Sequence, residues 1–151
     1  MTGWLLDTNV IAEISGAKPD ARVRKWISVQ EESVLFLSIL TLAEYDKGIH
    51  HLPDSDLRRP KLEADVAALE ARFRDRVLPL TNAIVRRWGR ISGQVKRATG
   101  HPPNIVDTLL AATSLERNLY LATRNTQDVI HSGAAVFDPW QDDPSGFPLT
   151  I

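Results

Sequence analysis

Short runs of strand-forming residues alternate with longer helical patterns along this chain, and this alternation restricts its fold more than any other feature. Five segments read as strands: residues 4–6, 34–38, 76–80, 119–122 and 135–137. The segments that read as helices lie between them, at residues 10–15, 21–29, 40–51, 61–74, 82–99 and 105–117. Strands that alternate with helices favour a parallel sheet covered by helices. The sequence therefore predicts an α/β fold with a central, five-stranded, mainly parallel sheet.

Two segments lack any regular period. Residues 52–60, "LPDSDLRRP", carry two prolines and several charges, so we expect a loop between two helices there. From Pro139 onward the sequence "PWQDDPSGFPLTI" contains three prolines, which predicts an irregular C-terminal tail. With 151 residues and no internal repeat, we expect one domain, formed by residues 1–140 and joined by the tail at 141–151.

Composition excludes several classes of function. The chain has no cysteine, which rules out disulfides, thiolate metal sites and a catalytic thiol. It also lacks a secretory leader and any apolar stretch long enough to span a membrane, so we expect a soluble, cytoplasmic protein with no membrane partner. The formal net charge of −1 gives no overall preference for nucleic acid, and any basic surface must be local.

Four carboxylates each have a purely structural interpretation. Asp7 can cap the helix that follows it, and Glu44 has the spacing of a capping box with Thr41. Asp107 and Asp128 each lie three residues after an asparagine, in what reads as the first turn of a helix, where the helix dipole favours an acid. None of the four is specific by itself.

Their common placement points to a shared role. In parallel α/β sheets, ligands bind beyond the carboxyl ends of the strands, where the strand order reverses. Asp7, Glu44 and Asp128 belong to that end by their positions after predicted strands, whereas the position of Asp107 depends on how its helix packs. Carboxylates that converge either bind protons or gather cations. Because the chain has no cysteine and its histidines are scattered, Mg²⁺ or Mn²⁺ is the expected cation.

The segment at 82–99 combines an apolar stripe with a basic one. Arg86, Arg90 and Arg97 fall within an arc of about 40° on a helix, which indicates either a solvated face or a surface that contacts the phosphates of a nucleic acid. Gly89 and Gly93 are four residues apart and allow close helix packing, for example in a homodimer. We interpret His50 and His51 as surface residues, and the loop residues His101 and His131 as structural or solvated.

Four blocks of sequence carry a resemblance to a known family. They are "LLDTNVIAE" (5–13), "LSILTLAEYDKGI" (37–49), "VDTLLAATSLERNLYLATRNTQDV" (106–129) and "GAAVFDPW" (133–140). In this order and spacing they resemble PIN-domain ribonucleases, specifically the VapC and FitB type of toxin from type II toxin–antitoxin pairs. The resemblance covers almost the whole chain. It implies a PIN-like fold, a site for Mg²⁺ or Mn²⁺, and cleavage of RNA.

The resemblance also implies roles for particular residues. The family's four acids fall on Asp7, Glu44, Asp107 and Asp128, and we expect Asp7 and Asp107 to be the direct metal ligands. The polar positions beside those acids, which are expected to support them or contact the substrate, fall on Asn9, Thr123 and Asn125. Where the family often has alanine after its third acid, this chain has Thr108. That departure removes no carboxylate.

The implied reaction is hydrolysis of an RNA phosphodiester that leaves a 5′-phosphate and a 3′-hydroxyl. The implied partners are a cognate antitoxin of the VapB or FitA kind, operator DNA reached only through that antitoxin, and a second copy of the chain. Two alternatives stay open on the sequence: a catalytically silent PIN module acting in an autorepressor complex, and a structure-specific DNA nuclease of the flap-endonuclease kind.

Overall fold

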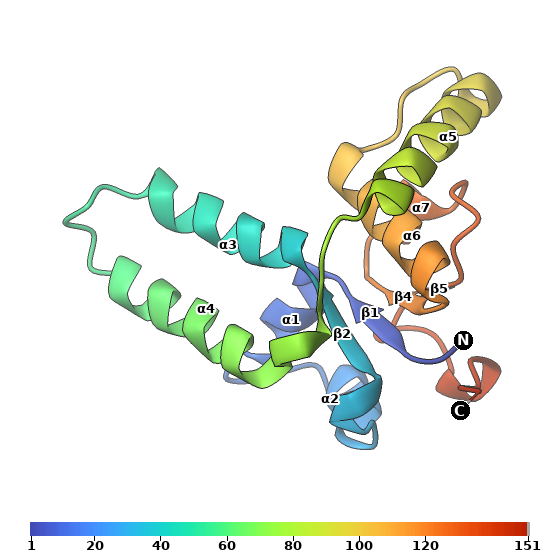
Figure 1. Cartoon of the computed structure of the whole chain (residues 1–151). Coiled ribbons are helices and arrows are strands. Elements are labelled where there is room, and N and C mark those ends of the chain that lie inside the picture. Colours follow the sequence, from blue (N-terminus) through green and yellow to red (C-terminus); the bar gives the residue numbers. More distant parts are fainter. Residues whose placement is uncertain (151) are drawn as a thin grey trace.

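A computed structural model describes residues 1–150, and at its centre is a parallel sheet (Figure 1). Its five strands are ordered β3-β2-β1-β4-β5, and every neighbouring pair is parallel. The strands are β1 (Trp4–Leu6), β2 (Leu35–Ser38), β3 (Val77–Leu78), β4 (Tyr120–Ala122) and β5 (Val136–Phe137). The predicted α/β fold with five strands is confirmed, and the sheet is wholly rather than mainly parallel.

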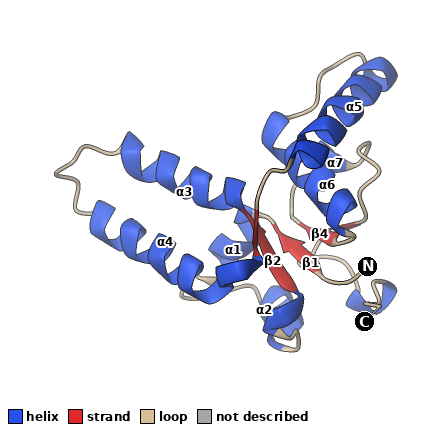
Figure 2. Cartoon of the chain, viewed as in Figure 1, coloured by secondary structure: helices blue, strands red, loops and turns tan. Residues whose placement is uncertain are grey.

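Helices connect these strands and cover both faces of the sheet (Figure 2). They are α1 (Thr8–Ile14), α2 (Ala21–Ser28), α3 (Ile39–His51), α4 (Arg59–Phe73), α5 (Asn82–Thr99), α6 (Ile105–Arg117) and α7 (Thr126–Val129). Single 3₁₀ turns lie at Glu32–Val34, Arg74–Arg76 and Pro144–Gly146. Within residues 1–150 no helix is both long and apolar enough to cross a membrane.

Two sequence predictions about local structure need correction. Helix α4 begins at Arg59, inside the segment predicted as a loop, because Pro60 lies in the first turn, where a missing N–H costs no hydrogen bond. Residues 126–129 form the short helix α7, which is absent from the predicted helical segments although Asp128 reads as part of a first helical turn. A four-residue helix is too short to show an apolar period.

Alternate residues of β1 serve the two faces of the sheet. Trp4 and Leu6 belong to a core with residues of α1, α2, α3 and α4, whereas Leu5 belongs to a second core with Leu110 and Ala111 of α6. Successive side chains of a strand point to opposite faces, so a strand covered on both faces is apolar throughout. This explains the uninterrupted "WLL" run, in which all three residues are buried.

The strand β1 approaches its neighbour closely at Gly3. A β-carbon added to Gly3 would lie 2.5 Å from the backbone carbonyl oxygen of Val34, a distance that real β-carbons do not adopt. The start of β1 therefore requires glycine if the β1–β2 pairing is to keep its position.

Helices α3 and α4 form a hairpin that projects from one side of the sheet, while α5 packs against α6 on the other side (Figure 1). The apolar stripe of α5 faces α6: Ile84, Ile91 and Val95 join Ala112 in a third cluster of buried side chains. Three separate parts of the fold can therefore position side chains: the sheet, the α3–α4 hairpin and the α5–α6 pair.

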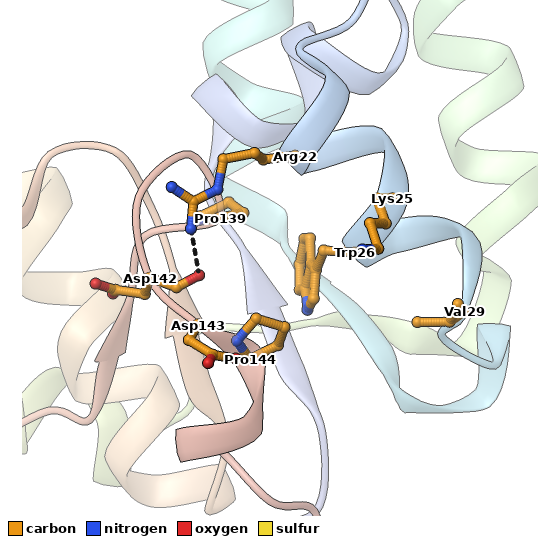
Figure 3. A pocket seen from close by; sticks show the side chains of 8 residues that line it. All are labelled: Arg22, Lys25, Trp26, Val29, Pro139, Asp142, Asp143 and Pro144. Carbon is orange, nitrogen blue, oxygen red and sulfur yellow. Dashed lines mark hydrogen bonds between the residues drawn. The ribbon is translucent and has the colours of Figure 1, made fainter.

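The C-terminal tail packs back onto α2. Arg22 donates a hydrogen bond to the carbonyl of Gln141 at 2.9 Å, and its contact with Asp142 is visible in Figure 3. Next to this contact lies a cavity of about 400 Å³ whose walls include Trp26 and Pro144. None of the four candidate acids lines it.

Candidate functional site

The strand order reverses between β1 and β4, and polar residues follow both strands at this point. The chain proceeds from β1 outward to β2 and β3, then returns to β4 on the other side of β1. Asp7 directly follows β1, and Thr123 directly follows β4. The Thr123 hydroxyl donates a 2.7 Å hydrogen bond to Oδ2 of Asp7. The reversal point is where parallel sheets bind ligands, so this pair lies at the expected place for a site.

Asp7 is buried and held by several donors. Its Oδ1 accepts a 2.7 Å hydrogen bond from the backbone N–H of Thr8, so Asp7 also caps α1 as its structural interpretation predicts. The amide of Asn9 donates to Oδ2 of Asp7 and lies within hydrogen-bond distance of the Thr123 hydroxyl. Burial raises the pKa of Asp7 above its usual range, although the hydrogen bonds from Thr123 and Thr8 act against this shift. The negative charge of Asp128 raises it further.

Glu44 lies in the second turn of α3. The capping box predicted for Thr41 and Glu44 is wrong, because Ser38 caps α3 by accepting a hydrogen bond from the N–H of Leu40. The carboxylate of Glu44 instead accepts a 3.1 Å hydrogen bond from the hydroxyl of Thr8. Partial burial and the charge of Asp7 raise the pKa of Glu44. Glu44 is therefore coupled electrostatically to the end of β1.

Asp107 occupies the first turn of α6. Asn104 caps this helix and accepts a hydrogen bond from the N–H of Asp107 at 3.0 Å. Burial raises the pKa of Asp107 to about 6, and three neighbouring carboxylates add to this shift, in decreasing order Asp7, Asp128 and Glu44. An acid with a pKa near 6 exchanges its proton close to neutral pH, a property typical of functional carboxyls.

Asp128 lies in α7 and is exposed. Its negative charge raises the pKa of both Asp7 and Asp107. The preceding Asn125 is joined to β4 through its backbone N–H, which donates to the Thr123 hydroxyl at 3.0 Å. The side chain of Asn125 makes no capping hydrogen bond to α7.

The structure thus brings the four acids into one electrostatically coupled group. They come from the residue that follows β1 and from α3, α6 and α7, which are far apart in the sequence. The donor set fits a hard divalent cation, because it consists of carboxylate oxygens. The pKa values of Asp7, Glu44 and Asp107 are raised first by burial and then by the negative charge of neighbouring acids. Among residues 1–150, however, no three acidic or histidine side chains lie close enough together to ligate one ion as they stand. Direct binding of one ion by three of these side chains would require them to move closer.

The arginines of α5 are not part of this group. Arg86, Arg90 and Arg97 are exposed, on the side of α5 opposite the stripe that packs against α6. Gly89 and Gly93 lie on the same outer side, and a β-carbon built on either would contact nothing within 4 Å. The structure therefore leaves this surface of α5 without a partner inside the described chain.

Thr8 and Thr41 were not singled out from the sequence as site residues, but they connect its parts. The Thr8 hydroxyl lies 3.2 Å from that of the buried Thr41 and also reaches Glu44. The position of Thr8 directly after Asp7 was the available signal. Thr108, the departure from the family pattern, is buried and donates its hydroxyl to the carbonyl of Asn104 at 2.5 Å, so its extra oxygen is satisfied inside α6.

Comparisons with known proteins identify relatives of this chain. The family model described as "PIN domain" matches residues 4–131. The plasmid stability protein StbB of Pseudomonas syringae pv. tomato is 33% identical over 91% of this chain and 98% of its own length. The VapC ribonuclease Y4jK of Sinorhizobium fredii is also 33% identical, over 91% of this chain and 97% of its own. The toxin FitB of Neisseria gonorrhoeae is 31% identical, over 91% of this chain and 99% of its own.

Solved structures of relatives share the fold. A chain in the structure of FitAB bound to the IR36 DNA fragment superposes with a TM-score of 0.81 at 28% identity, covering 93% of this chain and 97% of that one. A chain in the structure of FitAcB from Neisseria gonorrhoeae gives a TM-score of 0.79 at 29% identity, covering 91% and 98%. The family model, the relatives and the shared fold lead to one conclusion: this chain belongs to the PIN-domain family and is related along nearly its whole length to proteins of the VapC and FitB type.

Proposed function

We propose that this protein is a metal-dependent endoribonuclease toxin of a type II toxin–antitoxin pair. The observation that carries the proposal is the coupling of Asp7, Glu44, Asp107 and Asp128 at the reversal point of the sheet. The similarity to a VapC ribonuclease and to the toxin FitB supports the same reading.

In this proposal Asp7 and Asp107 hold Mg²⁺ or Mn²⁺, and Glu44 and Asp128 complete the acidic site. A bound divalent ion supplies charge stabilisation to the phosphate under attack. Thr123, Asn9 and the N–H of Thr8 fix the carboxylate of Asp7 before substrate arrives. Fixed groups of this kind need no reorganisation during the reaction.

The proposed reaction is an in-line attack of water on the RNA phosphodiester. A new bond forms between the water oxygen and phosphorus, and the bond from phosphorus to O3′ breaks, which leaves a 5′-phosphate and a 3′-hydroxyl. The water loses one proton and O3′ gains one.

Replacement of single acids tests the nuclease proposal. Asp7→Asn and Asp107→Asn each remove a charge without changing the size of the side chain, and we expect each to reduce RNA cleavage by about 100-fold or more. EDTA should abolish wild-type cleavage, and added Mg²⁺ or Mn²⁺ should restore it. Glu70→Gln on the exposed side of α4 is the matched control and should cleave like the wild type.

Cleavage that persists in EDTA, or in both asparagine variants, would contradict the proposal. If the wild type cuts no RNA with either metal, the alternative of a silent binding module gains support. If the wild type cuts DNA in preference to RNA, the alternative of a DNA nuclease gains support.

We also propose that a cognate antitoxin of the VapB or FitA kind binds and inhibits this chain, and that operator DNA is bound only through the antitoxin. The support is the similarity to FitB and to a chain of the FitAB–DNA structure. The exposed Gly89–Gly93 side of α5 is compatible with a homodimer. Light scattering after size-exclusion chromatography, with and without the antitoxin, measures both associations; a monomer in both conditions contradicts them.

A further inference from the structure

A second cavity lies beside the acidic group, between α5, the start of α6 and α7. It encloses about 280 Å³, and Asp128 forms part of its wall. The charge of Asp128 raises the pKa of Asp107 and Asp7. The cavity therefore adjoins the four acids through Asp128 without containing the other three.

The inner wall of this cavity is apolar. Ile91 and Val95 of α5 line it and are only 5% and 9% exposed. Thr108 of α6 also lines it, but its hydroxyl already donates to the carbonyl of Asn104. This wall therefore offers van der Waals contact and no open hydrogen-bonding group, which suits the face of a planar ring.

The rim of the cavity is polar. His101, Gln127 and His131 line the cavity and are exposed. Among residues 1–150 these three side chains make no hydrogen bond within the protein, in contrast to Ser132 on the same wall, which donates to the carbonyl of Val129. Imidazole rings stack on nucleobases, and a glutamine amide offers a donor and an acceptor to a base edge.

The outer wall is held by the loop that leads into α6. Gly100 ends α5 with a φ of 81°, and the loop continues through Pro102 and Pro103, which also line the cavity. The hydroxyl of Thr99 lies 3.1 Å from the carbonyl oxygen of His101 and 3.3 Å from its N–H. Two prolines and these contacts restrict the loop, so the cavity is formed before a ligand enters.

We propose that this cavity accepts one unpaired base of the RNA strand that the acidic site cuts. The proposal rests on the proposed ribonuclease function and names the part of the substrate that the protein reads. At about 280 Å³ the cavity lies just under the range of roughly 300–1,000 Å³ for pockets that enclose whole drug-sized ligands, so it holds a single ring system. The adjoining sugar–phosphate remains outside, on the side of Asp128. Sequence-specific recognition of RNA targets such unstacked bases.

Imidazole NMR gives a direct test that does not depend on cleavage. The chain contains four histidines, of which two line the cavity and two, His50 and His51, lie at the exposed end of α3. We expect short single-stranded RNA oligonucleotides, added in EDTA so that they stay intact, to shift the His101 and His131 resonances and to leave those of His50 and His51 in place. Equal shifts of all four, or none at His101 and His131 with any base, would overturn the proposal.

A cleavage assay then tests base reading. We expect Gln127→Ala to reduce the preference for the favoured base at one position near the cut by about three- to tenfold, the equivalent of one hydrogen bond. Gln94→Ala on the outer side of α5 is the matched control and should leave the preference unchanged. An unchanged preference in Gln127→Ala and in His131→Ala overturns base reading at this cavity.

The two proposals fail in different ways. If the histidines shift but the wild type cuts no RNA under any metal condition, the ribonuclease proposal fails and the cavity stands as a nucleobase site. If the wild type cuts RNA but neither histidine shifts and neither variant changes the preference, the cavity proposal fails and the ribonuclease proposal stands.

Discussion

At the scale of single residues, the site depends on how buried negative charge is supported. Asp7 is only 6% exposed, and its carboxylate is matched by the Thr123 hydroxyl, the Asn9 amide and the N–H of Thr8. These donors favour the charged form, while burial and neighbouring acids favour the neutral form. The net upward shift of its pKa shows that burial dominates.

The hydrogen bond from Thr123 to Asp7 is the shorter of the two that Asp7 accepts from side chains, and its loss should be measurable. Thr123→Val keeps the shape of the side chain but removes the donor, so the pKa of Asp7 should rise further. Hydrogen bonds to charged groups contribute about 1.5–3 kcal/mol, so we expect the free energy of unfolding to fall by about that amount at pH 7. Urea denaturation in EDTA measures this change in the free energy of unfolding, and Thr123→Ser, which keeps the hydroxyl, is the control. Equal unfolding midpoints for Thr123→Val and the wild type would show that this hydrogen bond does not stabilise the fold.

The raised pKa of Asp107 predicts how stability changes with pH in EDTA. The unfolded chain releases this proton near pH 3.8 and the folded protein near pH 6, so between these values the folded protein binds more protons. The contribution of Asp107 to stability is therefore lost as pH rises through about 6. Asp107→Asn should show a smaller decrease in the free energy of unfolding between about pH 4 and pH 7 than the wild type. Identical slopes for the two proteins, measured by urea denaturation, would show that Asp107 titrates normally.

At the scale of elements, the helices that the sequence predicted best are those with both ends marked. The bounds of α5 and α6 match the expected ones because each has a cap at its start, Thr81 or Asn104, and a left-handed residue at its end, Gly100 or Asn118. The start of α4 was missed because proline is compatible with both a loop and a first turn. Helix α7 has too few residues for a pattern.

The cap of α5 provides a test at this scale. The hydroxyl of Thr81 accepts a hydrogen bond from the N–H of Ile84 at 3.2 Å. Thr81→Ala should lower the free energy of unfolding by about 1 kcal/mol, since an unsatisfied donor is left at the helix start. Thr81→Ser keeps the acceptor and should stay close to the wild type. Thermal and urea unfolding of the wild type and the two variants measure the contribution of this cap to stability. Equal stability of the alanine and serine variants would mean that the cap contributes nothing.

At the scale of the whole molecule, three parts of the fold contribute to the acidic group: the sheet, the α3–α4 hairpin and the α6–α7 region. The C-terminal tail packs at another place, against β4, β5 and the N-terminal residue. Phe147 packs against Phe137 of β5 and Tyr120 of β4 at ring-centre distances of 4.8 and 5.3 Å, and the N–H of Thr150 donates to the carbonyl of Met1. The irregular tail is therefore part of the core that fixes the ends of β4 and β5.

Removal of the Phe147 ring tests this role. Complete loss of a buried phenylalanine costs about 3–5 kcal/mol, and Phe147 is half-buried, so Phe147→Ala should cost about 2 kcal/mol. Leu57→Ala is the control, because Leu57 is 94% exposed in the α3–α4 loop and its loss should have no effect. Matching unfolding midpoints for Phe147→Ala and Leu57→Ala would show that the tail does not contribute to the core.

The sequence by itself determined the order of strands and helices, the apolar first strand and the carboxylate that ends it. These are local properties, since periodicity, caps and turn residues act over a few neighbouring positions. It also placed Asp7 and Glu44 after their strands. It could not place Asp107, whose helix follows a loop rather than a strand.

The tertiary structure decided what depends on distant segments. Packing of α6 against β1 and α5 brings Asp107 near Asp7, and burial is the largest of the causes that raise its pKa to about 6. It also brings His101 and His131, which look like isolated loop residues in the sequence, to one cavity beside Asp128. Burial and the interaction of charges depend on distances in space, and residues separated by tens of positions acquire those distances only when the layers of the fold pack together.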